Sequence, residues 1–224
     1  MDIISIHIPK TGGTTLYAVL KQVYGDKLSK SYRRRDLIAE TSLAGVFAPN
    51  TSGRVTVLHG HFHYPEIKHL HQTSNTKLIT WLRDPVQRVL SNYHFFKALF
   101  DHPQRNPKDY ERNKHRSHQT LMEYAALPEC QNRMNLFLNG AVLQDFFFIG
   151  VQDNFESDLK LLANKLDWPN VSIPFKNVTS RPSASPNKKE LEQLISWNIK
   201  DVALYVQVMK ERELPYPVIY DDFL

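Results

Sequence analysis

The sequence has almost no cysteine, no long apolar run and no repeat, and each absence excludes a class of protein. It has one cysteine, Cys130, among 224 residues, which excludes an intramolecular disulfide and a cysteine-rich zinc site. No apolar run in the sequence approaches the roughly 20 residues that cross a membrane. Neither an internal repeat nor a low-complexity tract is present. What these absences leave is a soluble globular protein, and the cysteine count is consistent with a reducing compartment.

The remaining composition suits one sizeable core. Hydrophobic residues make up 42% of the chain, and nothing in its composition divides it, so we predict a single domain over residues 1–224. The net charge is +5, and basic residues gather in 27–35 and in 97–118, a polar segment that we interpret as a loop. Such patches attract polyanions. No RNA- or DNA-binding motif accompanies them, so an anionic glycan is favoured over a nucleic acid as partner.

A strand, a glycine-rich turn and a helix follow one another near the start of the chain. Residues 3–8 form an apolar run, and the sequence PKTGGTT at 9–15 connects it to an apolar helical pattern. Gly12 and Gly13 let backbone N–H groups approach an anion, and the first turn of the helix adds a positive dipole end. The two threonines that follow are expected to cap the helix. This pattern predicts a phosphate cradle.

The order of residues in this cradle differs from that of an ATP-binding loop. A Walker A loop places its lysine after the glycines and a serine or threonine for Mg²⁺ next, whereas Lys10 precedes Gly12 here. No clear Walker B aspartate is present either. An ATP-using kinase is therefore the less favoured reading, and we expect a phosphate-bearing ligand to be held without a metal. A strand, turn and helix with no ligand is the structural alternative.

A second segment adds a candidate phosphate ligand. Residues 76–82 read as a buried strand, followed at once by Arg83, by Asp84 as a helix cap and by Pro85 in the first helical turn. Ligands of open α/β sheets bind beyond the carboxyl ends of strands, where an arginine fork is well matched to phosphate. Pairing of Arg83 with a carboxylate for stability is the alternative.

Histidines follow a third apolar run. Residues 55–58 read as a short strand ending in His59-Gly60-His61, and the imidazoles are candidates for a general base or for structural roles. Five histidines between 59 and 71 also raise a zinc hypothesis. The single cysteine and the lack of an HExxH helix count against zinc, so no metal site is predicted.

Together these motifs resemble those of a known family. HIPKTGGTT at 7–15 and LRDPVQRVLSNY at 82–93 resemble the two nucleotide-binding signatures of sulfotransferases that use 3′-phosphoadenosine 5′-phosphosulfate (PAPS). The most similar branch is the carbohydrate branch that contains heparan sulfate 2-O-sulfotransferase, and 148–162 and 197–205 resemble its later blocks. The resemblance covers most of the chain.

The resemblance implies a role for each motif residue. The loop 10–15 would hold the 5′-phosphosulfate, Arg83 and Ser91 the 3′-phosphate, and Arg181 would belong to a basic loop that closes over the nucleotide. His61 would be the catalytic base, with His59 beside it, and Lys10 would neutralise the leaving oxygen. The donor-binding residues implied in this way are Lys10, Thr11, Gly12, Gly13, Thr14, Thr15, Arg83, Ser91 and Arg181.

Sulfuryl transfer requires residues of these types. Sulfuryl transfer is an in-line displacement at sulfur, in which positioning and electrostatic stabilisation should dominate, as in phosphoryl transfer. An alcohol is a poor nucleophile at neutral pH, so a base with a pKa near ~6.5 is the natural proton acceptor. We therefore expect a PAPS-dependent O-sulfotransferase acting on a hydroxyl of a glycan. The non-enzymatic alternative is a nucleotide- or polyanion-binding protein that has lost catalysis.

The expected fold is α/β, a P-loop-like, mostly parallel sheet with helices on both faces, because strands alternate with helices along the chain. Further predicted elements are a strand at 145–150, helices at 119–127, 154–166 and 187–212, and loops at 26–54 and 177–186. The first strand follows Met1 directly, so no signal peptide is expected. We expect a cytoplasmic bacterial enzyme, and a Golgi location only if a membrane anchor has been removed.

Overall fold

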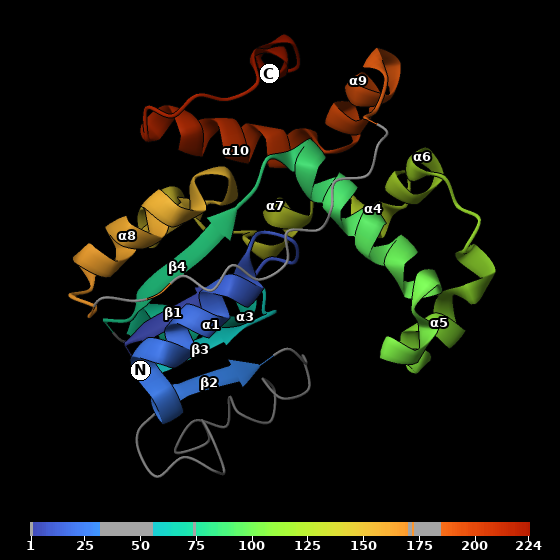
Figure 1. Ribbon diagram of the computed structural model, residues 1–224. Helices are drawn as coiled ribbons and strands as arrows, with labels where there is room; N and C mark the ends of the chain where they lie inside the picture. The colour runs from blue at the N-terminus through green and yellow to red at the C-terminus, as the bar shows by residue number, and fades with distance from the viewer. Residues whose placement is uncertain (1, 32–55, 74, 170–171, 173–184) are drawn as a thin grey trace. The chain divides into compact units, whose positions relative to one another are not determined.

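Five short strands form one parallel sheet, in the order β2-β3-β1-β4-β5 (Figure 1). Their bounds are β1 (Ile3–Ile6), β2 (Leu28–Ser31), β3 (Val57–Gly60), β4 (Lys77–Leu82) and β5 (Phe148–Val151). Strand β1 is central, since Ile6 pairs with Gly60 of β3 on one side and with Thr80 of β4 on the other. All four residues of β1 are buried, as expected of a parallel strand covered on both faces. The predicted parallel sheet is confirmed.

The computed structural model describes residues 2–31, 56–73, 75–169, 172 and 185–224. The chain divides into two compact units, one formed by Met1–Arg83 with Met134–Val178 and the other by Asp84–Arg133 with Thr179–Leu224. The sheet lies in the first unit. That the whole of 1–224 acts as a single domain stays a prediction.

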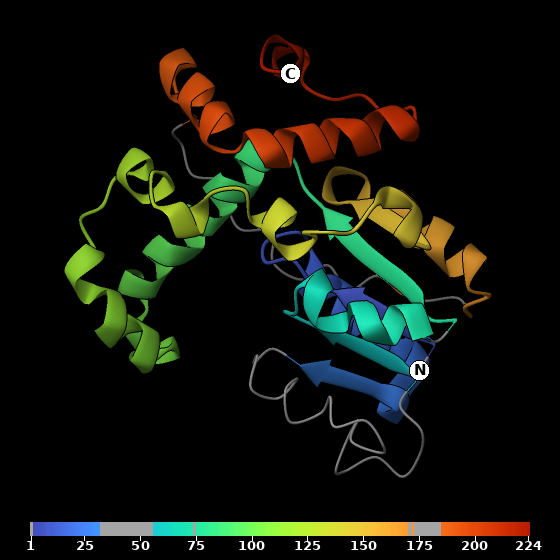
Figure 2. The same ribbon diagram turned by 180° about the vertical axis from the view of Figure 1, so that it is seen from behind.

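Helices cover both faces of the sheet. Helices α1 (Gly13–Tyr24) and α8 (Phe155–Lys165) lie on one face, and α3 (Tyr64–Thr73) lies on the other (Figures 1 and 2). The connection from β1 to β2 runs across the sheet in the opposite direction to that from β3 to β4. Right-handed crossovers therefore place α1 and α3 on opposite faces. A binding site is expected beside β1, where the direction of the connections reverses.

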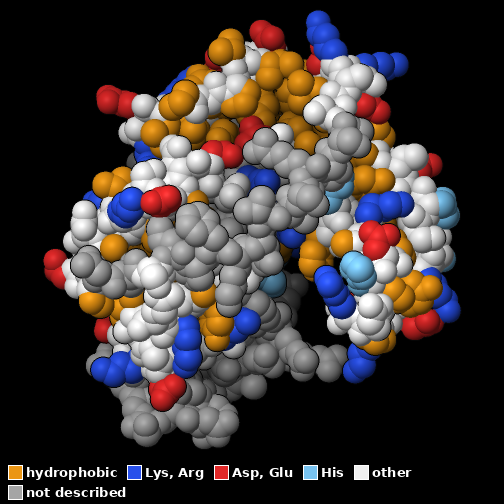
Figure 3. All heavy atoms as spheres, viewed as in Figure 1, with side chains coloured by type: hydrophobic (Ala, Val, Ile, Leu, Met, Phe, Trp, Pro, Cys, Tyr) orange, Lys and Arg blue, Asp and Glu red, His pale blue; other side chains and the backbone are white. Residues whose placement is uncertain are grey.

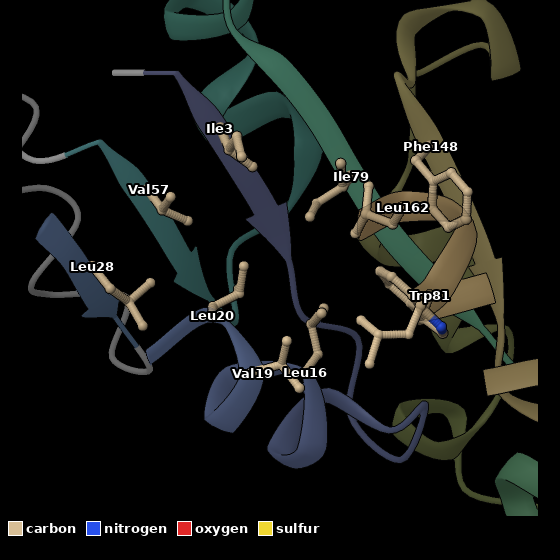
Figure 4. Packing of buried hydrophobic residues seen from close by; sticks show 11 residues of the cluster. Ile3, Leu16, Val19, Leu20, Leu28, Val57, Ile79, Trp81, Phe148 and Leu162 are labelled. Atoms are coloured by element: carbon tan, nitrogen blue, oxygen red, sulfur yellow. The ribbon is translucent and has the colours of Figure 1, made fainter. Parts of the chain in front are cut away.

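The core under α1 and α8 is built from alternate strand residues (Figure 4). Because successive side chains of a strand point to opposite faces, every second residue of each strand faces these two helices. The buried members of this cluster are Ile3, Leu16, Val19, Leu20, Leu28, Val57, Ile79, Trp81, Phe148, Leu159 and Leu162. This packing holds the first turn of α1 above the ends of the central strands.

The second unit is helical among its described residues. Its helices are α4 (Pro85–Asp101), α5 (Pro107–Asn113), α6 (Leu121–Ala125), α9 (Lys188–Trp197) and α10 (Ile199–Glu211), while α7 (Arg133–Phe137) starts at its boundary. A small core forms around Phe96, Tyr124 and Cys130.

Short 3-10 turns occur in both units. They lie at Gly25–Lys27, Pro103–Arg105, Lys114–Arg116, Pro128–Cys130, Leu143–Asp145, Gln152–Asn154 and Val218–Asp222.

Helix α4 begins as predicted. Asp84 is its N-cap and accepts a hydrogen bond from the Gln87 N–H at 2.8 Å, and Pro85 occupies the first turn. The Tyr220 hydroxyl donates a second bond to Asp84 at 2.6 Å. Burial of its hydroxyl and the neighbouring Asp84 carboxylate raise the Tyr220 pKa, so Tyr220 stays a donor.

A buried ion pair lies within the second unit. The Arg88 guanidinium of α4 is 1% exposed, and its Nη2 donates to the Cys130 carbonyl oxygen at 3.0 Å. Its Nε lies 3.7 Å from the Oδ2 of Asp201 on α10, which is fully buried. Burial lowers the Arg88 pKa, and the Asp201 carboxylate opposes that shift. A buried pair of this kind makes the unit sensitive to loss of either partner.

The predicted closing helix at 187–212 is wrong in one respect, because it is two helices that meet at Asn198. The Asn198 amide donates to the Leu194 carbonyl, and its oxygen accepts from the Asn132 N–H at 3.0 Å. The Asn132 side chain in turn accepts from the Lys200 N–H at 2.9 Å, in the first turn of α10. A side chain distant in sequence thus caps the new helix start, which periodicity cannot reveal.

Three further predictions need correction. The segment 97–118 is not a loop, since α4 continues to Asp101 and α5 follows within the segment. Strand β2 lies inside the basic segment 27–35, where no strand was predicted. Strand β3 extends two residues beyond its predicted end, so its last residues are His59 and Gly60. Pairing with neighbouring strands, a tertiary effect, adds these residues to the sheet.

The predicted strand at 145–150 is confirmed as β5 with shifted bounds, and the helices at 119–127 and 154–166 as the shorter α6 and α8. Most of 26–54 and 177–186 lies outside the described residues. Within the part of the chain that the structure describes, no helix combines the length and the apolar character needed to cross a membrane.

Candidate functional site

The loop between β1 and α1 has an unusual backbone. Both Lys10 (φ 74°) and Gly12 (φ 91°) are in the left-handed region, which costs a side-chain-bearing residue about 1–2 kcal/mol. Two hydrogen bonds brace the loop. The buried Thr11 hydroxyl donates to the Ile8 carbonyl at 2.8 Å, and the Arg83 Nη1 donates to the Lys10 carbonyl at 3.2 Å. Residues from the ends of β1 and β4 thus hold one loop conformation.

Both glycines of the loop are required by their surroundings. Gly12 is the N-cap of α1, and a Cβ there would lie 3.0 Å from the Phe155 ring as well as straining the backbone. At Gly13 a Cβ would lie 1.9 Å from the ring of His7, which is shorter than any contact between real atoms. The loop therefore passes as close to its neighbours as a backbone without side chains allows.

The predicted caps at the start of α1 are wrong. Gly12 is the N-cap, and it has no side chain that could make a capping hydrogen bond. Thr14 and Thr15 lie inside the first helical turn, whereas a capping side chain must come from the residue before it. The helix therefore starts at a glycine, and the N–H groups of a first helical turn are donors of the kind that anion sites use.

Two cations meet at this loop. Arg83 follows the last residue of β4, and its guanidinium reaches the loop at Lys10. Burial, and then the positive charge of Arg83, lower the Lys10 pKa below its ordinary value. A bound anion between two such cations would reverse that effect. Ser91 lies on α4 in the second unit, so its part in a site with Arg83 stays a prediction.

The two histidines of the His-Gly-His motif differ in burial. His59, within β3, has no exposed surface, and its Nδ1 lies in hydrogen-bonding distance of the Ser5 Oγ at 2.9 Å. Burial, and then neighbouring His61, lower the His59 pKa to about 3. His61 follows the end of β3 and is partly exposed. His61 is therefore the more accessible residue of the two, and its role as the base stays a prediction.

A third histidine, His7, belongs to the same cluster and is absent from the predicted site. Its ring stacks on that of His59, with centroids 5.1 Å apart, and lies 4.5 Å from that of His61. It is 8% exposed, and burial, followed by the other two imidazoles and two lysines, lowers its pKa to about 2. The signal in the sequence was the two-residue alternation of the apolar run 3–8, which puts Ser5 and His7 on one face.

These buried histidines predict a loss of stability in acid. A histidine that stays neutral in the folded protein takes up a proton in the unfolded chain below its ordinary pKa of about 6.5. The unfolding free energy therefore decreases as the pH falls through 6.5. For His7 and His59 together we expect a decrease of about 2–3 kcal/mol between pH 7.5 and 5.5. Urea unfolding at the two pH values measures it.

The contribution of one histidine can be separated by a variant. In His7→Phe the unfolding free energy should decrease by only about half as much between pH 7.5 and 5.5. Only one of the two buried neutral histidines, His59, then remains. The same change at the exposed His69 should leave the decrease as it is in the wild type. Equal pH dependence in the wild type and in His7→Phe would contradict the prediction.

Two other predictions concern a metal site and Arg181. Among the described residues, no group of three or more histidines, cysteines or carboxylates is arranged to hold a metal ion. Arg181 lies outside the described residues, so its predicted contact with a nucleotide has no structural account.

Comparison with known proteins identifies a family and a relative that the chain resembles. The family model described as "Sulfotransferase domain" matches residues 1–153. Galactosylceramide sulfotransferase of Bos taurus is 25% identical over an alignment of 238 residues, gaps included. The match covers 91% of this chain and 55% of the relative. The chain therefore spans about half the length of that curated relative.

Two solved structures are also similar. A sulfotransferase from Alicyclobacillus acidocaldarius is 16% identical with a TM-score of 0.48, and the match covers 96% of both chains. A mouse sulfotransferase complexed with PAP is 13% identical with a TM-score of 0.45, covering 90% of this chain and 65% of that one. The family match is the finding that decides, because it spans more than half of the chain and includes the loop after β1, His61 and Arg83. The chain belongs to the sulfotransferase family.

Proposed function

We propose that this chain transfers a sulfuryl group from PAPS to a hydroxyl of a carbohydrate, with His61 as general base and without a metal. The observation that carries the proposal is the loop after β1, where Arg83 from the end of β4 donates to the carbonyl of left-handed Lys10. This arrangement brings two cations and the N-terminus of α1 to the carboxyl end of the central strands. A donor with phosphates on both sides of its ribose matches them.

The two anionic ends of the donor would bind different residues. The 5′-phosphosulfate would bind the loop 10–15, with Lys10 beside the bridging oxygen that leaves as sulfur is transferred. The 3′-phosphate would bind Arg83, and a part for Ser91 stays a prediction from the family resemblance. The residues present fit this donor, because Lys10 and Arg83 supply two cations and the start of α1 supplies the N–H groups of its first turn.

The acceptor would be activated from β3. In the transfer, the acceptor oxygen forms a bond to sulfur while the bond from sulfur to the phosphate oxygen breaks. The acceptor proton passes to the His61 imidazole as its oxygen attacks. His61 is partly exposed and follows a strand that pairs directly with β1, so it is attached to the same rigid sheet as the phosphate loop. Buried His59 would not meet the acceptor.

We propose a sugar as the acceptor because the relative from Bos taurus is named for galactosylceramide, a glycolipid. An anionic sugar chain would suit the second unit, in which α5 and the turn after it carry exposed basic side chains. Figure 3 shows Lys, Arg and His side chains on this part of the molecule. The residues concerned are Lys108, Arg112, Lys114 and His115. Two of them pair with acidic neighbours, which reduces the net charge of the surface.

Calorimetric binding of 3′-phosphoadenosine 5′-phosphate (PAP) tests the donor assignment. We expect PAP to bind without Mg²⁺ and more tightly than ADP or ATP. Arg83→Met should weaken PAP binding by about 10- to 100-fold, the loss of a charge-assisted contact. The control is Arg105→Met, an exposed arginine in the second unit, which should bind PAP like the wild type.

Two other results would decide against the proposal. Preference for ATP in the presence of Mg²⁺ would indicate a kinase. Absence of nucleotide binding would indicate a protein that has lost the donor site.

A further inference from the structure

His7 connects the phosphate loop to the candidate base. It follows β1 directly, and its N–H donates to the Gly60 carbonyl at 2.8 Å, so its backbone is joined to the end of β3. We propose that His7 is a positioning residue, whose ring sets the orientation of His61 relative to the loop that would hold the donor. The inference rests on the proposed function, in which His61 is the base.

The first contact of the His7 ring is with the loop. The ring occupies the space beside Gly13 that a side chain would otherwise fill, since a Cβ there would overlap three of its atoms, at 1.9 to 2.5 Å. Gly13 is the first residue of α1 and lies in the segment that would cradle the phosphosulfate. A change in the size of the His7 side chain would therefore alter the support under the start of α1.

The second contact is with the other two imidazoles. His59 is held by the Ser5 hydroxyl and is fully buried, so it forms a fixed surface inside the sheet. The His7 ring stacks on it at an interplanar angle of 23°, and His61 lies against His7 at 58°. His61 is the partly exposed member of this row. Its freedom to rotate is limited on the side where His7 packs.

The surroundings of His7 keep its imidazole uncharged beside His61. The groups whose charges lower its pKa are His59 and His61 at the end of β3, Lys30 of β2 and Lys10 of the loop, all of them bases. Burial and these neighbours keep His7 uncharged at neutral pH. When His61 accepts a proton from the acceptor, the adjacent neutral ring adds no repulsion. His7 therefore does not compete with His61 for the proton.

Two substitutions separate positioning from general support of the fold. His7→Leu keeps much of the volume but lacks a flat ring, and His7→Phe keeps the ring but lacks nitrogens. With galactosylceramide in detergent micelles as acceptor, we expect His7→Leu to lower kcat by about 10- to 100-fold, the effect of a misplaced catalytic group. PAP binding should change by less than about threefold, and His7→Phe should recover most of kcat. His69→Leu is the matched control, because His69 is exposed on α3.

A second measurement needs no acceptor. NMR of the protein labelled with ¹⁵N-histidine follows the titration of the His61 ring, whose pKa depends on burial and on its neighbours. We expect that pKa to move by about half a unit or more in His7→Leu and by less in His7→Phe. A purely structural role of His7 would lower the melting temperature without changing the His61 titration.

The outcomes distinguish the two proposals. Failure of the wild type to bind PAP would remove the proposed function itself. If the wild type binds PAP but the His61 titration and kcat are the same in His7→Leu as in the wild type, only the role of His7 is overturned. A titration of His61 that shifts in His7→Leu and not in His69→Leu supports that role even where galactosylceramide is not an acceptor.

Discussion

Lys10→Met is expected to lower kcat for sulfuryl transfer by about 100- to 1,000-fold, the loss found when one preorganised group at a developing charge is removed. Lys10 lies in the loop after β1, and we propose that its ammonium neutralises the oxygen that leaves sulfur. The interaction strengthens as that charge develops, so kcat should fall more than KM for PAPS rises. Steady-state kinetics with PAPS and a glycan acceptor measure both constants.

The backbone of the loop should survive this substitution. Methionine carries a Cβ as lysine does, so the cost of the left-handed conformation at Lys10 is unchanged, and Arg83 still donates to the same carbonyl. Lys21→Met is the matched control, since Lys21 is an exposed lysine in the last turn of α1 and contacts Gly25 and Asp26. A Lys10→Met enzyme with unchanged kcat and raised KM would show that Lys10 binds the donor without stabilising the transition state.

Arg88→Ala is expected to lower the unfolding free energy by about 3–5 kcal/mol, because it removes one partner of a buried ion pair. Asp201 is fully buried, and the Cys130 carbonyl also loses the hydrogen bond from Arg88. The truncation in addition leaves a cavity in the helical unit. Urea unfolding followed by circular dichroism measures the change.

An exposed ion pair of similar geometry provides the control. Arg112 lies 3.7 Å from Asp109 on α5, the same N to O distance as in the buried pair, with side chains 75% and 46% exposed. Arg112→Ala should change the unfolding free energy by less than about 1 kcal/mol, since water screens such pairs. The double variant Arg88→Met, Asp201→Asn should be more stable than Arg88→Ala. Equal effects of Arg88→Ala and Arg112→Ala would contradict the role of burial.

Several elements were predicted from the sequence because their signals are local. A strand buried on both faces is a short apolar run, which placed β1, β4 and β5 to within a few residues. The start of α4 was predicted at Asp84 and Pro85, since a cap and the residue after it are neighbours in the chain. A glycine-rich turn was predicted before α1, and Gly12 in this turn has the left-handed conformation that glycine adopts easily.

The roles of the histidines could not be separated in this way. The His-Gly-His motif alone predicts two similar imidazoles, but β3 pairs with both β1 and β2 and so extends to Gly60, which buries His59. The contact of His7 with both His61 and Gly13 likewise joins residues that the chain keeps apart. Burial of a side chain depends on what other segments pack against it, and a local pattern does not contain that information.

The amino-acid pattern was thus sufficient for the parallel sheet, the glycine-rich loop before α1 and the family signatures, since each depends on residues that are close together in the chain. Tertiary packing decided the rest. It buried the pair of Arg88 and Asp201, and it divided the last long helix at Asn198, where Asn132 provides the new cap. The physical reason is the same in each case, because the free energy of a buried charge or a helix start depends on a partner that only the folded chain brings near.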